Sequence, residues 1–245
     1  MPRKHIVPKE RDLQLLSGLE GLSWVSPKQL HRLATSLSFS NCGRNDVIFS
    51  EMEERGTQVC ILLSGVARLT CLNSRKERVL VTLIAPGVIP DLPFLIPKID
   101  CRFQCDAFTD CRVGRIRSHD FMQIVLGVQL PDFRKLSANA VAHWSQLLMR
   151  CSNLFRFRLH ERLAITLLQL GSEFGARDPS GLLLRVPLTI EELAQLVGAS
   201  RQKTAEQMTQ LEHEAVIIRR GRQVVLRPDR LEALVQREMA FDELR

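Results

Sequence analysis

One stretch, residues 188–226, constrains the fold more than any other part of the 245-residue chain. It reads LTIEELAQLVGASRQKTAEQMTQLEHEAVIIRRGRQVVL. Thr189 is followed three residues later by Glu192, so a hydroxyl and a carboxylate can each satisfy a free amide at the start of a helix. Gly198 predicts where this helix ends, because only glycine takes the left-handed cap conformation without steric cost.

A second helix is expected to follow almost at once. Ser200 is a favourable N-cap, and the helix should run to about Glu214, with Met208 and Leu211 on its inner face. Two helices joined by so short a glycine turn must meet at a steep angle. The second helix is then free to project into a DNA major groove.

A β-hairpin is predicted directly after the helices. Residues 216–218 and 224–226 are rich in β-branched side chains, and the turn between them carries Arg219, Arg220 and Arg222. Residues 215–228 contain four arginines and no acidic residue, which suits a phosphate backbone. A solvated surface hairpin has the same pattern, and glycine-stopped helical hairpins are common, so spacing alone leaves both readings open.

The segment resembles the DNA-binding region of the CRP/FNR family of bacterial transcription regulators. The resemblance is carried by a Val-Gly turn, a Ser-Arg helix start and a Leu-Glu pair near the helix end: Val197, Gly198, Ser200, Arg201, Leu211 and Glu212. It implies that Arg201 and Gln202 read base edges, while Ser200, Lys203 and Thr209 hold phosphates. Arginine bonds guanine bidentately and glutamine bonds adenine in the same way. Thr189 and the three hairpin arginines complete the expected DNA-binding set.

Three positions depart from the family pattern. Glu206 stands where the family usually presents a second base-reading arginine, and a carboxylate can only accept a hydrogen bond, for instance from a cytosine amine. Thr204 and Gln207 are more polar than the inner face of this helix usually is. The target sequence therefore does not follow from the family's best-known operators.

Composition and charge agree with a nucleic-acid partner. The net charge is +7 with a pI near 9.3, although a basic enzyme would look the same. No apolar run approaches a membrane span, and the first residues lack the apolar core of a signal peptide, so a cytoplasmic protein is expected. Seven cysteines without repeated close pairs are expected to be mostly reduced thiols.

The rest of the chain predicts an α+β fold. Two short helices are expected within residues 12–37, and residues 39–116 contain short β-rich runs at 47–49, 59–63, 67–71, 79–84, 103–108 and 112–116. Such runs, separated by turn residues, predict a small barrel or sandwich. They resemble the cyclic-nucleotide-binding β-roll of the same family over roughly residues 13–126. The expected domains are a jelly-roll-like sensor at 1–128, a long dimerisation helix at 129–157 and a winged helix-turn-helix at 158–245.

The middle segment has a helical pattern with a coiled-coil seam. Its apolar positions alternate at spacings of four and three: Ala140, Trp144, Leu147, Cys151 and Leu154. A helix that packs only on its own domain remains the alternative, and the resemblance implies the dimer helix. A largely buried helix is expected over residues 158–170, and Pro228 and Asp229 should open a last helix.

The expected effector pocket departs from that of family members that bind cyclic AMP. Those members supply Gly-Glu after a Pro-Gly turn and Arg-Ser on the next strand, whereas this chain has Asp91 and Leu92 in the first place and Arg102 near the second. Arg102 is displaced by one strand position, which turns a side chain to the opposite face. Binding of cyclic AMP by the usual contacts is therefore not expected, and no effector or cofactor is assigned.

Cysteines offer an alternative sensor. Cys101, Cys105 and Cys111 lie close in sequence, and a redox switch or metal site would need thiolates in suitable geometry. Small apolar cysteines that fill a β-core are the commoner case. The first cysteine is Cys42, so the N-terminal cysteine group of the oxygen-sensing branch is absent, and the six histidines show no helpful pairing. No metal site is predicted.

The leading hypothesis is a homodimeric, sequence-specific transcription regulator. Its expected partners are double-stranded DNA, a second copy of the chain, RNA polymerase and a small-molecule effector. The alternative is a ligand-binding or protein-interaction module whose winged helix docks protein, which Glu206 favours. An enzyme is not expected, because the chain has no Gly-rich phosphate loop, HExxH, CxxC or nucleophile elbow.

Overall fold

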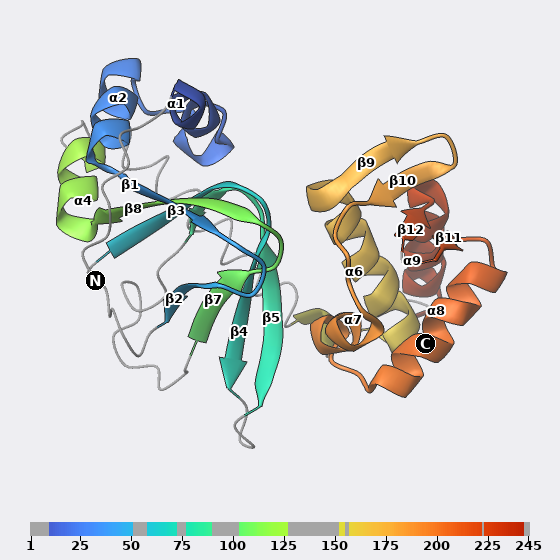
Figure 1. Cartoon of the computed structure of the whole chain (residues 1–245). Coiled ribbons are helices and arrows are strands. Elements are labelled where there is room, and N and C mark those ends of the chain that lie inside the picture. Colours follow the sequence, from blue (N-terminus) through green and yellow to red (C-terminus); the bar gives the residue numbers. More distant parts are fainter. Residues whose placement is uncertain are drawn as a thin grey trace. The chain divides into compact units, whose positions relative to one another are not determined.

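The computed structural model describes residues 10–50, 58–72, 77–89, 103–126, 152–154, 157–221 and 223–242. The chain divides into two compact units, Met1–Ser145 and Gln146–Arg245 (Figure 1). Among the described residues, none of the helices has both the length and the apolar character needed to cross a membrane.

The first unit is a β-sandwich with helices on one side. Its elements are α1 (Glu10–Ser17), η1 (Glu20–Leu22), α2 (Pro27–Ser36), β1 (Ser38–Cys42), β2 (Val47–Ser50), β3 (Gln58–Ser64), β4 (Ala67–Leu72), β5 (Arg78–Ile84), β6 (Gly87–Ile89), β7 (Phe103–Ala107), β8 (Cys111–Arg117) and α4 (Ser118–Leu126). The strands form two antiparallel sheets, in the orders β1-β8-β3-β6 and β2-β7-β4-β5. The predicted β-roll is therefore confirmed.

Strand β3 shows how the layers are held together. Successive side chains of a strand point to opposite faces. Ile61 and Leu63 accordingly pack in the cluster that includes the helices, whereas Cys60 and Leu62 pack in the cluster that holds the two sheets together. Burial on both faces is why residues 59–63 read as one continuous apolar run.

Two strands of this unit were missed. The first β-rich run was expected at residues 47–49, but β1 precedes it and continues to Cys42. A turn follows, in which the backbone N–H of Gly43 donates to the Asp46 carboxylate at 2.8 Å. Strand β6 is only three residues long and lies between the runs expected at residues 79–84 and 103–108. A strand as short as β6 has no sequence pattern of its own, and β1 contains two serines and an asparagine, which weaken its strand signal.

The second unit is a winged helix-turn-helix with an enlarged sheet. Its elements are α6 (Leu159–Phe174), β9 (Gly175–Asp178), β10 (Gly181–Leu184), α7 (Ile190–Val197), α8 (Arg201–His213), β11 (Ile217–Arg220), β12 (Gln223–Leu226) and α9 (Pro228–Asp242). The sheet order is β11-β12-β10-β9, so a second hairpin extends the predicted one. The helix predicted over residues 158–170 continues to Phe174, and its buried Leu163, Leu167 and Leu170 pack the core of the unit.

The β9–β10 hairpin was not predicted. A β-carbon added at Gly175 would lie 2.2 Å from the Gly171 carbonyl oxygen and 2.6 Å from Leu182 Cγ. At Gly181, whose φ is +145°, it would lie 2.1 Å from the Leu226 carbonyl oxygen. Glycine is therefore required at both positions, at Gly175 because of α6 and β10 and at Gly181 because of β12, and these contacts exist only in the folded unit.

The predicted dimerisation helix lies largely outside the described residues. Ala140, Trp144, Leu147 and Cys151 cannot be placed, whereas Leu154 lies in a short helical segment with 40% of its surface exposed. The coiled-coil seam therefore stays a prediction.

Candidate nucleic-acid interface

The turn between α7 and α8 has the predicted geometry. Thr189 Oγ1 accepts from the backbone N–H of Glu192 at 3.2 Å, and the Glu192 carboxylate accepts from the backbone N–H of Thr189 at 2.8 Å. Gly198 has φ 66° and ψ 47°, and its N–H is directed at the carbonyl oxygens of Ala194 and Gln195. The capping box and the glycine stop are both confirmed, so the angle at which α8 leaves α7 is fixed by local chemistry.

The inner face of α8 is anchored in the core of the second unit. Ser200 Oγ accepts from the backbone N–H of Lys203 at 3.3 Å, and Met208 and Leu211 are almost completely buried. Thr204 is also fully buried, and its hydroxyl donates to the Ser200 carbonyl oxygen at 3.0 Å. The polar residue at this position is therefore satisfied within its own helix.

The outer face of α8 carries the residues expected to contact DNA. Five of them are exposed on this helix: Arg201, Gln202, Lys203, Glu206 and Thr209. Gln202 Nε2 donates to Glu206 Oε1 at 3.1 Å, one helical turn along. The unusual carboxylate thus orients the neighbouring glutamine and leaves the glutamine carbonyl available as an acceptor.

Two of the hairpin arginines pair with acidic residues from elsewhere in the unit, although residues 215–228 themselves contain no acidic residue. Arg219 Nε donates to Glu212 Oε2 on α8 at 2.6 Å, and Arg220 contacts Asp178 Oδ2 on β9 at 3.0 Å. The hydrogen bond from Arg219 lowers the pKa of the Glu212 carboxyl. The pKa of Asp178 is lowered by the backbone N–H of Ser180, with a further contribution from Arg220.

The β11–β12 hairpin is the wing of the winged helix-turn-helix, and these ion pairs engage two of its arginines. Arg219 links the wing to α8, and Arg220 links it to the second hairpin. The partners lie 7 and 42 positions away in the sequence, so a local charge count could not find them. Arg222 lies outside the described residues.

His160 joins the candidate site although sequence reasoning found no partner for it. Its Nδ1 lies 2.7 Å from Gln207 Oε1, and its Nε2 lies 3.4 Å from Glu214 Oε2. This contact gives a hydrogen-bond partner to Gln207, which had looked too polar for the inner face of α8. The 47-residue separation left no local signal for it.

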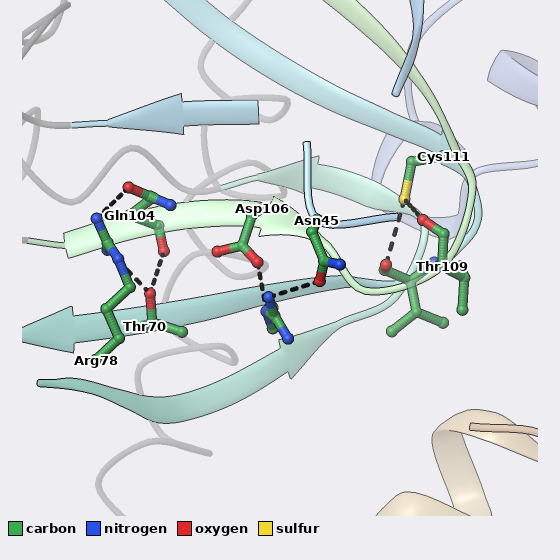
Figure 2. Close-up of polar contacts among 9 residues, drawn as sticks. Asn45, Thr70, Arg78, Gln104, Asp106, Thr109 and Cys111 are labelled. Atoms are coloured by element: carbon green, nitrogen blue, oxygen red, sulfur yellow. Dashed lines mark hydrogen bonds and ion pairs between the residues drawn. The ribbon is translucent and has the colours of Figure 1, made fainter. Parts of the chain in front are cut away.

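The residues predicted for the effector pocket, Asp91, Leu92 and Arg102, lie outside the described residues, as does Cys101 of the alternative thiol sensor. Cys105 and Cys111 are buried in the sandwich, and burial raises the pKa of both thiols. The Cys111 thiol donates to the carbonyl oxygens of Val66 and Thr109, each at 3.2 Å (Figure 2). Burial therefore favours the neutral thiol at both positions, and a neutral thiol is a poor metal ligand.

Polar side chains on β4, β5 and β7 pair with one another. Arg78 donates to Gln104 and, at 3.4 Å, to Thr70 (Figure 2). In the same sheet, Arg68 pairs with Asp106 and donates to Asn45 at 3.0 Å. These arginines therefore hold strands together rather than leaving their cations open to a ligand.

A cleft of about 490 Å³ lies between α1 and the ends of β1, β3 and β8 in the described part of the first unit. Its lining includes Asp12, Asn41, Cys42, Ser64, Cys111 and Arg112. Arg112 donates to both oxygens of the nearly buried Asp12 carboxylate, at 3.0 and 2.8 Å. The volume is within the range of small-molecule sites, and sequence reasoning did not point to this cleft.

Known proteins resemble the two units separately and the chain as a whole. Residues 40–127 match the family described as the cyclic nucleotide-binding domain, and residues 161–234 match the Crp-like helix-turn-helix domain. A CRP-like cAMP-activated global transcriptional regulator of Mycobacterium tuberculosis (strain H37Rv) is 25% identical over 206 residues, which cover 82% of this chain and 89% of the relative.

Solved structures show the same fold. FixK2 from Bradyrhizobium japonicum has a TM-score of 0.67 at 20% identity and covers 81% of this chain and 96% of its own. The c-di-GMP responsive global regulator CLP of Xanthomonas campestris has a TM-score of 0.66 at 18% identity and covers 82% and 99%. With a cyclic nucleotide-binding domain followed by a Crp-like helix-turn-helix, the chain belongs to the CRP/FNR family of transcription regulators.

Proposed function

We propose that this regulator binds DNA sequence-specifically as a homodimer, with α8 as the recognition helix. The observation that carries the proposal is the division of α8 into two faces. Thr204, Met208 and Leu211 fix the inner face in the core, and the outer face presents polar and cationic side chains to solvent. A helix held in this way can enter a major groove without losing its own packing.

Each outer residue has a distinct proposed role. Arg201 reads guanine, and Gln202, oriented by Glu206, reads a neighbouring base. Lys203 and Thr209 hold phosphates. The wing arginines do the same when DNA phosphates displace the carboxylates that pair with Arg219 and Arg220. Thr189 fixes the start of α7 through its capping box. At this helix N-terminus its proposed role is to contact the DNA phosphate backbone.

A palindromic operator follows if the chain dimerises through residues 129–157. Twofold symmetry would place two recognition helices about 34 Å apart, close to one turn of the duplex. The proposed operator is therefore an imperfect palindrome with half-sites near one helical turn apart. RNA polymerase is the proposed partner of the bound dimer.

The test begins with duplexes selected by the purified protein from a random library. Arg201→Ala should weaken binding to the selected site by about 1–3 kcal/mol and relax one base position. Lys203→Ala should weaken all sequences alike and reduce the slope of log K against log salt by about 0.9.

Arg32→Ala is a suitable control, since it removes the same charge from an exposed position on α2 of the other unit. An unchanged base preference in Arg201→Ala would contradict the proposed reading role. If no duplex is bound in a salt-sensitive manner, the winged helix serves a ligand-binding or protein-interaction module instead.

The proposed sensor is an effector domain that does not bind cyclic AMP by the usual contacts. Asp91, Leu92 and Arg102 support this through their departures from the family pattern, although the M. tuberculosis relative is described as cAMP-activated. Calorimetric titration with cyclic AMP tests the proposal, and micromolar binding would refute it. A thiol sensor that uses Cys101, Cys105 and Cys111 is the weaker alternative, because burial of two of these groups suppresses the thiolate.

A further inference from the structure

Four polar side chains form a closed ring between α6 and α8. His160 Nδ1 meets Gln207 Oε1 at 2.7 Å, and Gln207 Nε2 donates to Gln210 Oε1 at 3.3 Å. Gln210 Nε2 donates to Glu214 Oε1 at 2.9 Å, and Glu214 Oε2 lies 3.4 Å from His160 Nε2. We call these four residues the His160 ring. It joins the start of α6 to the flank of α8 over two turns of the helix.

The protonation state of the histidine follows from counting donors around the ring. An ionised Glu214 can only accept, so Gln210 must donate to it, and the Gln210 oxygen must then accept from Gln207. The Gln207 oxygen consequently faces His160 Nδ1. Both imidazole nitrogens therefore meet acceptors, and only the imidazolium can donate to both.

A neutral histidine leaves one contact of the ring without a proton. With the proton on Nδ1, the lone pair of Nε2 faces the Glu214 carboxylate. With the proton on Nε2, both glutamine amides would have to reverse to serve Nδ1, and the Gln210 oxygen would then oppose the Glu214 oxygen. Neither tautomer satisfies all four contacts.

The surroundings supply no competing partner for the Glu214 carboxylate within the described contacts. On α6, the Glu161 carboxylate accepts from the backbone N–H of Arg158 at 2.8 Å. On α9, Arg230 donates to the backbone carbonyl oxygens of Glu214 and Ala215 rather than to the carboxylate. On β11, Arg219 pairs with Glu212. The His160 side chain is 14% exposed, so the ring supplies its main polar contacts.

We propose that His160 is a positioning residue for the recognition helix, and that protonation of its imidazole couples the placement of α8, and hence DNA binding, to pH. The proposal rests on the proposed function of α8. Histidine is the side chain that ordinarily changes charge between about pH 5 and 8. The complete ring holds α8 at low pH, and loss of the proton loosens its attachment to α6 as the pH rises.

One variant separates this role from a merely structural one. In Glu214→Gln the new amide can accept from Gln210 and donate to His160 Nε2. Nδ1–H still donates to Gln207, so a neutral histidine completes the ring. This substitution should preserve binding and abolish its pH dependence. Glu214 is 41% exposed, so the variant should fold.

The experiment measures affinity for the selected duplex between pH 6 and pH 8 at constant ionic strength. In the wild type, affinity should fall with rising pH by at most tenfold per pH unit, the limit for one linked proton. His160→Gln should bind more weakly at pH 6 and show a reduced slope, and Glu214→Gln should be flat. His213→Gln, which removes the exposed histidine of α8, should keep the wild-type slope. Equal slopes in all four proteins would overturn the proposal.

A second readout does not depend on DNA. Nitrogen-15 NMR of the histidine side chains in the free protein distinguishes an imidazolium from either neutral tautomer. His160 should be doubly protonated at pH 6 in the wild type, and more readily deprotonated in Glu214→Gln. A neutral His160 at pH 6 would refute the ring. A protonated ring in a protein that binds no duplex would instead refute the proposed function.

Discussion

The substitution Gly198→Ala tests whether the turn before the recognition helix is set by backbone geometry. At φ 66° the alanine would adopt a left-handed conformation that costs an L-residue about 1–2 kcal/mol. Its β-carbon would also lie 2.8 Å from Leu154 Cδ2. Leu154 is 40% exposed and can move, so this contact should add only about 0.5–1.5 kcal/mol, the cost of an off-rotamer side chain.

Gly221 provides a matched control within the same unit. It has nearly the same φ, 65°, but nothing lies within 4 Å of its added β-carbon. Gly221→Ala therefore measures the backbone cost alone, together with the unfolded-state effect that both substitutions share. We expect Gly198→Ala to be the more destabilising of the two by the cost of the Leu154 contact.

Urea denaturation followed by circular dichroism measures the two free energies, and hydrogen exchange of the α8 amides reports on this unit specifically. Adding Leu154→Ala should remove the excess, which appears as a coupling energy in a double-mutant cycle. If Gly198→Ala is as stable as the wild type, the left-handed turn is not required. If the costs of Gly198→Ala and Leu154→Ala simply add, the contact is not the source of the excess.

Substitutions at three further positions test the supports of the site by the same denaturation measurements. Thr189→Ala should lose about 1 kcal/mol through its capping box, whereas Thr189→Ser should keep most of it; equal stability of both would rule out the cap. Leu211→Ala should lose about 2–5 kcal/mol, since its side chain is fully buried, and a loss below 1 kcal/mol would show that the inner face is loosely packed. Asp178 has a lowered pKa, so its contribution to stability is present above its unfolded pKa and is lost as pH falls through the folded value. Arg220→Ala should raise that pKa towards its ordinary value and flatten the rise of stability with pH below about pH 4; an unchanged profile would mean that the Ser180 contact alone sets the shift.

The elements of α7 and α8 could be predicted because their signals are local. Thr189, Gly198 and Ser200 act on backbone groups within four residues, so the sequence determines them without any tertiary contact. The β9–β10 hairpin could not be predicted in the same way. Its glycines are required by Leu182 and Leu226, and the second of these is 45 positions from Gly181.

The polar residues of the site show the same limit. Thr204 and Gln207 both looked out of place on an inner helix face, but for different reasons. Thr204 bonds to the carbonyl of Ser200 one turn earlier, whereas Gln207 depends on His160 on another helix. Hydrogen-bond partners within one helix can be anticipated from spacing, and partners on different helices require the fold.

Besides its buried inner face, three features position α8 in the second unit. Gly198 fixes it to α7, the Arg219–Glu212 pair fixes it to the wing, and the His160 ring fixes it to α6. The wing pair lies near the outer face, so a phosphate that draws Arg219 away releases Glu212 beside the duplex, where its charge repels DNA. The net gain from this arginine should therefore be smaller than its charge suggests. Because the Arg219–Glu212 pair can be broken by the duplex in this way, the angle of the recognition helix should depend mainly on its buried inner face, on Gly198 and on the His160 ring.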